Sequence, residues 1–140
     1  MFLIRESAFL QYFFQLFTFV IGQRYSNIII TEQPSDLTFL NTMQGSINCR
    51  SEGHPTPTVT WLTESGSPVT DIPNLRSVQN DRIIFHQFQS SQYNAQIHNA
   101  KYRCKVASLA GEILSRLATV RAGELLSPSN PIMIEDERYG

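Results

Sequence analysis

Short segments in which apolar and polar residues alternate run from about residue 26 to residue 122. Alternation with a period of two is typical of half-buried strands. Glycine and proline clusters separate the segments and predict turns between them. No long helical period occurs here, so the pattern predicts an all-β domain over residues 26–122. The expected strands cover residues 46–50, 59–61, 82–85, 102–106 and 113–121.

The first 22 residues follow a different pattern. Arg5 stands near the start, and an uncharged, phenylalanine-rich stretch leads to Val20 and Gly22, which suit the −3 and −1 positions of a cleavage site. A charged start, an apolar middle and a small exit residue predict a secretory signal peptide over residues 1–22, cleaved before Gln23. An uncleaved anchor and a buried helix are the alternatives. Polar residues interrupt the run, which is short for a span of about 20 residues.

Export determines the chemistry expected of the two cysteines. Cys49 and Cys104 are the only cysteines of the chain, and an oxidising compartment allows a bridge to form and persist. Two buried free thiols are the alternative. Cys49 and Cys104 are 55 residues apart, and a bridge that closes a loop of this length contributes about 4 kcal/mol to stability in the chain-entropy model.

After residue 22 no second apolar stretch is long enough to span a membrane. We therefore expect a secreted or extracellular product, held at a cell surface only through a segment downstream of this chain.

Trp61 follows the first cysteine, and Tyr102 stands just before the second. In a sandwich of two sheets, the disulfide crosses between the sheets and the indole packs against it. The tyrosine closes the corner before the sixth strand by bonding its hydroxyl to nearby backbone. The alternating positions place further apolar residues on the same inward faces. The expected core residues are Ile47, Val59, Trp61, Tyr102 and Val106.

These residues form the motifs Gly53-x-Pro55-x-Pro57-x-x-x-Trp61 and Tyr102-x-Cys104, with Gly111 following. The combination resembles an immunoglobulin domain of the intermediate type found in cell-adhesion molecules. More narrowly, residues 68–76, 84–88 and 102–122 are similar to the first immunoglobulin domain of the Dscam (Down syndrome cell adhesion molecule) family. The resemblance implies an immunoglobulin-like β-sandwich that acts in homophilic cell adhesion, neuronal self-recognition and axon guidance, and in immunity in arthropod members. The partner it implies is a second copy of the chain or another cell-surface immunoglobulin protein.

The chain departs from this family pattern at a few positions. Many intermediate-type domains have an aspartate four residues before the corner tyrosine, where this chain has His98. Many also have alanine and asparagine after the second cysteine, where Val106 and Ser108 stand. The replacement of the aspartate by His98 affects one local hydrogen bond or ion pair and leaves the sandwich itself unaffected. The tail over residues 123–140 matches no following domain, and its prolines and acidic run predict a linker or disordered end.

Charge and chemistry narrow the function. The chain has 11 Lys+Arg against 12 Asp+Glu, a net charge of −1, which argues against a nucleic-acid partner. Its histidines, His54, His86 and His98, carry no catalytic signature, and we expect His86 and His98 at a strand edge and in a loop. No phosphate-binding loop or metal-ligand spacing occurs. We therefore expect no enzyme, cofactor, metal or small-molecule substrate.

The remaining chemistry lies on the surface, where arginines predominate. Arginine suits protein interfaces because its planar fork binds carboxylates and stacks on rings. On the strand of Cys104, Arg103 and Lys105 should point outward. Ordinary solubility of strand surfaces is the alternative for each residue. The candidate interface residues are Arg76, Arg82, Arg103, Lys105 and Arg116, with Arg121 as a further candidate. A soluble immune-recognition or ligand-binding protein and an intracellular muscle-type domain are the alternative functions.

Overall fold

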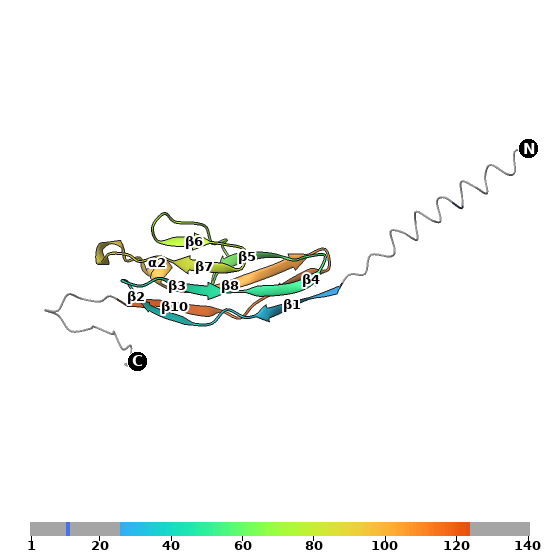
Figure 1. Cartoon of the computed structure of the whole chain (residues 1–140), viewed down its shortest axis with the longest axis horizontal. Helices are drawn as coiled ribbons and strands as arrows, with labels where there is room; N and C mark the ends of the chain where they lie inside the picture. Colours follow the sequence, from blue (N-terminus) through green and yellow to red (C-terminus); the bar gives the residue numbers. More distant parts are fainter. Residues whose placement is uncertain (1–10, 12–25, 124–140) are drawn as a thin grey trace, which may run out of the picture.

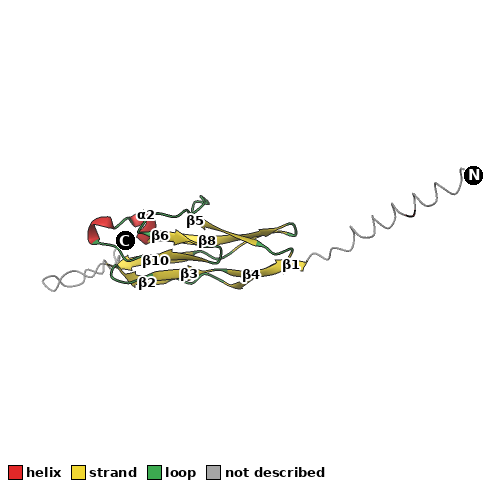
Figure 2. Ribbon diagram, turned by 45° about the horizontal axis from the view of Figure 1, so that its top comes forward, coloured by secondary structure: helices red, strands yellow, loops and turns green. Residues whose placement is uncertain are grey.

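Two layers of strands packed on each other make up the domain in this computed structural model (Figures 1 and 2). The structure describes residue 11 and residues 26–123. Apart from residue 11, the expected signal peptide lies outside the described residues, and so does the tail from residue 124 onward. Within the described residues, no helix has the length and apolar character needed to cross a membrane.

The first layer contains the strands in the order β3-β7-β6. Their bounds are β3 (Gly45–Asn48), β7 (Arg82–Phe85) and β6 (Arg76–Val78). Beyond Cys49 the chain continues into β4 (Arg50–His54), which pairs antiparallel with β1 (Ser26–Glu32). Figure 1 shows β3 and β4 lying end to end.

The second layer follows the order β2-β10-β8-β5. Its strands are β2 (Leu37–Leu40), β10 (Ala118–Gly123), β8 (Asn99–Ser108) and β5 (Thr58–Thr63). The short strand β9 (Gly111–Leu114) pairs with the far end of β8. All pairs are antiparallel except β2 with β10, which run parallel. The chain therefore leaves β1 in one layer and enters β2 in the other.

The expected single strand over residues 113–121 is wrong, because the chain forms two strands, β9 and β10, with a break at residues 115–117. The Cys104 amide donates to the Ser115 hydroxyl oxygen at 2.9 Å, and the Ser115 amide donates to the Cys104 carbonyl at 2.9 Å. The side chain of Ser115 thus occupies one place in the strand ladder. Two short helices, η1 (Ser90–Gln92) and α2 (Ala95–His98), were also not expected.

The core lies between the layers and is joined across them by the disulfide Cys49–Cys104, which confirms the expected bridge. Trp61 stands opposite Cys104 in the β5–β8 register. Ile47, Trp61, Tyr102 and Val106 are buried, while Val59 is half-buried and packs against the core. Three phenylalanines complete it, and the ring of Phe39 approaches those of Phe85 and Phe88 at 5.8 and 6.4 Å.

Candidate binding face and the corner that supports it

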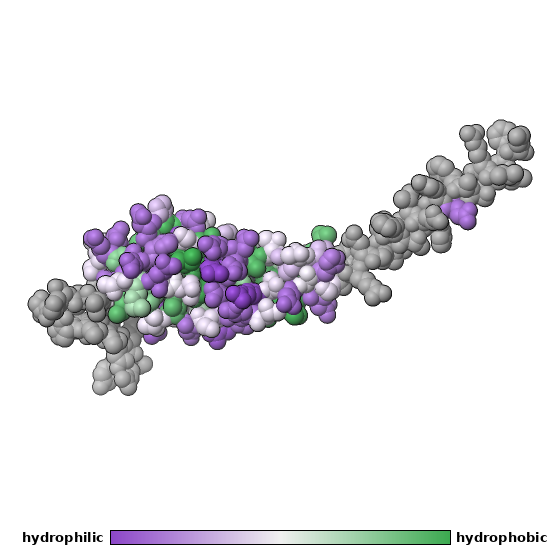
Figure 3. Space-filling model, viewed as in Figure 1, coloured by the Kyte–Doolittle hydropathy of each residue, from purple (hydrophilic) through white to green (hydrophobic). Residues whose placement is uncertain are grey.

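The outer face of the second layer, called here the cationic face, is set by the alternation of β8. Tyr102, Cys104 and Val106 are fully buried, so Lys101, Arg103 and Lys105 lie on the opposite side of the strand. Figure 3 shows that hydrophilic and apolar residues intermingle on the side of the molecule in view. The register sets the neighbours of the three cations: Leu62 stands opposite Arg103, Thr60 and Leu114 opposite Lys105, and Thr119 opposite Lys101.

Two carboxylates border this row of cations. Lys101 Nζ lies 3.1 Å from Glu64 Oε1, and Lys105 Nζ lies 3.8 Å from Glu112 Oε2. Both pairs are exposed, and such pairs contribute at most about 1 kcal/mol each. Arg103 donates only to the Glu64 carbonyl, at 3.4 Å. In the described part of the chain Arg103 has no carboxylate partner, so its charge is available to a binding partner.

Arg121 extends the cationic face beyond Lys101, at the end where β8 begins. It stands opposite Asn99 in the β10–β8 register, on the same side as Lys101, and it is exposed. Among the ion pairs of the described residues, none involves Arg121. Arg103 and Arg121 are therefore two cations on one face that have no carboxylate partner within residues 26–123.

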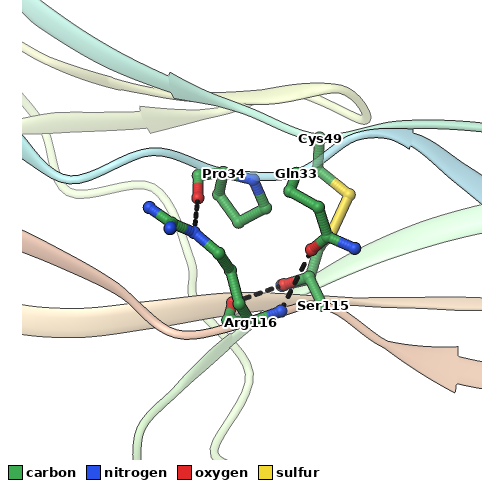
Figure 4. Close-up of a disulfide and its surroundings, with 6 residues drawn as sticks. Gln33, Pro34, Cys49, Ser115 and Arg116 are labelled. Carbon is green, nitrogen blue, oxygen red and sulfur yellow. Dashed lines mark hydrogen bonds between the residues drawn. A yellow bond between two sulfur atoms is a disulfide. The ribbon is translucent and has the colours of Figure 1, made fainter.

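Arg82 and Arg116 are held by contacts within the domain. Arg82 pairs with Asp81 at 3.3 Å, and this hydrogen bond lowers the pKa of the Asp81 carboxyl below its ordinary value. Arg116 Nε donates to the Pro34 carbonyl at 2.7 Å, and its Nη2 lies 3.6 Å from Asp36. Figure 4 shows Arg116 beside the disulfide, bonded to the segment that crosses from β1 to β2. Both guanidiniums remain partly exposed, so their roles in an interface stay predictions.

Arg76 does not lie on the surface, and its prediction as an interface residue is wrong. It is 7% exposed. Its Nε and Nη2 donate to the Thr70 carbonyl at 3.1 and 2.9 Å, and its Nη1 donates to the Tyr102 hydroxyl at 3.2 Å. These acceptors satisfy the buried guanidinium, which otherwise would be costly to remove from water. Arg76 is therefore a structural residue of the corner before β8.

Tyr102 is the centre of this corner. Its hydroxyl accepts from Arg76 and donates to the Ile97 carbonyl at 3.0 Å, and its ring lies 5.6 Å from that of Phe85. Burial raises the pKa of the Tyr102 hydroxyl, an effect that the Arg76 charge opposes. The hydroxyl therefore keeps its proton at neutral pH and can donate to the backbone, as expected for a tyrosine corner.

His98 occupies the same corner and lies in α2, where it is 0% exposed, instead of in the expected loop. Its ring stacks on Phe88 at 3.9 Å and faces Tyr93 at 5.5 Å. Burial lowers the pKa of the His98 imidazole, and the Arg76 charge lowers it further. His86 lies at the edge of its layer, just beyond β7, and pairs with the Ser77 hydroxyl at 2.6 Å. No group of three or more His, Cys, Asp or Glu side chains able to hold a metal occurs among the described residues.

Two layers joined by a disulfide, a tryptophan at its core and a tyrosine corner define an immunoglobulin domain. No protein-family profile matches the chain. Individual proteins do match. The Drosophila melanogaster cell adhesion molecule Dscam2 is 36% identical over 94 residues, which are 66% of this chain and 4% of the relative. Dscam1 of the same organism is 30% identical over 96 residues, 68% of the chain and 5% of the relative.

Solved structures agree with these matches. The N-terminal four immunoglobulin domains of Dscam1 isoform 7.44 align with a TM-score of 0.71 and 27% identity, over 74% of this chain and 27% of that one. A structure described as the basis of Dscam isoform specificity aligns with a TM-score of 0.68 and 28% identity, over 73% of this chain and 27% of the other. The described domain is an immunoglobulin domain of the Dscam family. The named relatives are adhesion proteins rather than enzymes.

Proposed function

We propose that this domain is an extracellular recognition module that binds proteins in cell–cell adhesion. The observation that carries the proposal is the cationic face, where Arg103 and Arg121 lie on one side of a sheet and have no carboxylate partner among the residues that the structure describes. The names of the relatives support adhesion. Since the chain spans 4–5% of their length, homophilic binding, neuronal self-recognition and axon guidance are parts of the proposal. The proposal also includes secretion of the chain, or its display at a cell surface through a downstream segment.

The charges restrict how two copies can meet. If the same rows of β8 faced each other, Lys101, Arg103 and Lys105 would oppose like charges, which costs several kcal/mol in an interface. An offset arrangement instead brings the cations of one copy against Glu64 and Glu112 of the other. We infer that a homophilic contact through the cationic face is offset. It should weaken with salt, because exposed charges are screened over about 8 Å at physiological ionic strength.

A bead-clustering assay tests the proposal. A stable interface needs roughly 800 Å² on each partner, so one domain gives a weak contact and multivalency supplies the rest. The secreted chain, fused to a multimeriser, is coated on beads, and beads of one kind should cluster. Arg103→Glu should reduce clustering, whereas Arg50→Glu, an equal charge change on β4 of the other layer, should not. If such beads never cluster but microbial surfaces bind them, the soluble immune-recognition alternative replaces this proposal.

A further inference from the structure

His98 is a buried titratable group that the binding face does not use. Its imidazole stacks on the ring of Phe88 at an interplanar angle of 14° and lies at 28° to the ring of Tyr93. Phe88 is itself buried, and the Tyr93 ring contacts both rings of this stack, at 6.3 Å from Phe88 and 5.5 Å from His98. His98 therefore packs helix α2 against the segment that follows β7.

The hydrogen bonds around His98 accept only its neutral form. The Asn94 amide donates to His98 Nδ1 at 3.0 Å, so Nδ1 carries no proton and the neutral ring has its proton on Nε2. Nε2 is buried and has no partner among the described residues. A second proton would have to enter at Nδ1, where it would meet the N–H of Asn94. Protonation therefore breaks this bond without creating another.

The charges around the ring also oppose protonation. Arg76 on β6 is the cation that acts on the imidazole, and Tyr93 and Tyr102 are the other titratable groups of the cluster. The remaining residues of α2 are uncharged, and β10, which packs on α2, turns its buried Ala118 inward. Among the described residues no ion pair includes Arg76 or His98. A protonated His98 would thus be a second buried cation without a carboxylate.

Helix α2 depends on Asn94, the residue whose amide donates to His98. The Ile97 and His98 amides both donate to the Asn94 carbonyl, at 2.9 and 2.7 Å, and the Asn94 side chain caps the Gln96 amide at 2.9 Å. We propose that His98 is a proton-sensitive latch whose protonation in mild acid releases α2 and the adjoining residues 88–94 from the sandwich. The strands that carry the disulfide remain paired, because the β3–β7 and β5–β8 ladders do not include this segment. Release exposes Phe88 and Ile97, which are buried in the closed corner.

The direction of the pH effect follows from linkage. The pKa of His98 in the closed corner lies below its ordinary value of 6.5, so the open form binds the proton more readily. The closed corner is therefore fully stable above about pH 6.5 and loses stability as the pH falls below that value. The population of the open form can rise by up to about tenfold between pH 7.5 and 5.5. This inference does not depend on which partner the domain binds.

Amide hydrogen exchange at pH 7.5 and 5.5, corrected for the intrinsic rate at each pH, tests the latch. Protection of the Ile97 and His98 amides should fall by up to about tenfold at the lower pH. Protection of the Cys49 amide, which donates to the Asp81 carbonyl at 2.7 Å at the disulfide, should not change. Flat protection at Ile97 and His98 would overturn the proposal.

Histidine variants assign the effect, because the chain has only His54, His86 and His98. The double variant His54→Gln/His86→Gln should keep the acid response, and its loss in that variant would overturn the proposal. His98→Asp, which places a carboxylate beside Arg76, should move the loss of protection to below about pH 4, the range of an ordinary aspartate. If His98→Asp keeps the loss between pH 7.5 and 5.5, His98 is not the latch. Should His98→Asp fail to fold, the double variant and the wild-type exchange data decide.

Discussion

Removing the hydroxyl of Tyr102 is the most direct test of the corner. Tyr102→Phe keeps the ring, which is 0% exposed and packs on Phe85, and deletes one oxygen atom. That oxygen accepts from Arg76 Nη1 at 3.2 Å and donates to the Ile97 carbonyl at 3.0 Å. The substitution therefore leaves one buried donor of a cation and one buried carbonyl without this partner.

The cost follows from the type of bond lost. A hydrogen bond to a charged group contributes about 1.5–3 kcal/mol, and a buried group left without a partner costs about 1–3 kcal/mol. Arg76 keeps both of its bonds to the Thr70 carbonyl, so the two costs do not add in full. We expect Tyr102→Phe to lower the free energy of unfolding by about 2–3 kcal/mol.

Equilibrium unfolding in urea measures this difference. With a slope of about 1–3 kcal/mol per molar urea, the midpoint should fall by roughly 0.7–3 M at an unchanged slope. Tyr93→Phe is the matched control, since Tyr93 is 39% exposed, and it should stay within about 0.5 kcal/mol of wild type. If Tyr102→Phe is as stable as Tyr93→Phe, the hydroxyl does not hold the corner and the reasoning fails.

Two further predictions concern the core. Reduction of the bridge between Cys49 and Cys104, or its replacement by two alanines, should cost about 2–5 kcal/mol; urea midpoints with and without reductant measure it, and equal midpoints would contradict it. Gly45→Ala should cost about 1–3 kcal/mol, because its Cβ would lie 2.8 Å from Leu37 Cδ2 and 3.2 Å from Phe39 Cγ; a melting temperature equal to wild type would show that both side chains move aside freely.

The sequence predicts the sandwich well in strands where apolar and polar residues alternate, and poorly in strands where they do not. In β8, inward and outward residues alternate without a break, so its face assignment follows from the pattern alone. In β1, Ile28, Ile29 and Ile30 are all apolar, although Ile29 is 51% exposed, and a period of two cannot be seen. The break between β9 and β10 depends on the Ser115 hydroxyl reaching the Cys104 amide, a contact that only the folded chain creates.

The corner was less predictable than the face. An arginine on a strand normally indicates surface, and Arg76 is buried because the fold brings the Thr70 carbonyl and the Tyr102 hydroxyl to it. One signal in the sequence pointed to this corner. Many domains of this type have an aspartate at the position of His98, so in this chain Arg76 lies near a neutral ring and not near a carboxylate. Arg103 and Lys105 follow from the alternation around Cys104, but the carboxylates that border them come from β9 and the end of β5.

The parallel pairing of β2 with β10 has a mechanical consequence. The N-terminal end of β2 and the C-terminal end of β10 lie at opposite ends of the same pair, with Leu37 beside Val120 and Leu40 beside Gly123. Tension applied through the two ends of the chain pulls these strands along their length in opposite directions. Their hydrogen bonds then bear the load together and do not open one after another. Once they fail, the bridge between Cys49 and Cys104 still closes the chain between them, which limits how far a loaded domain can extend.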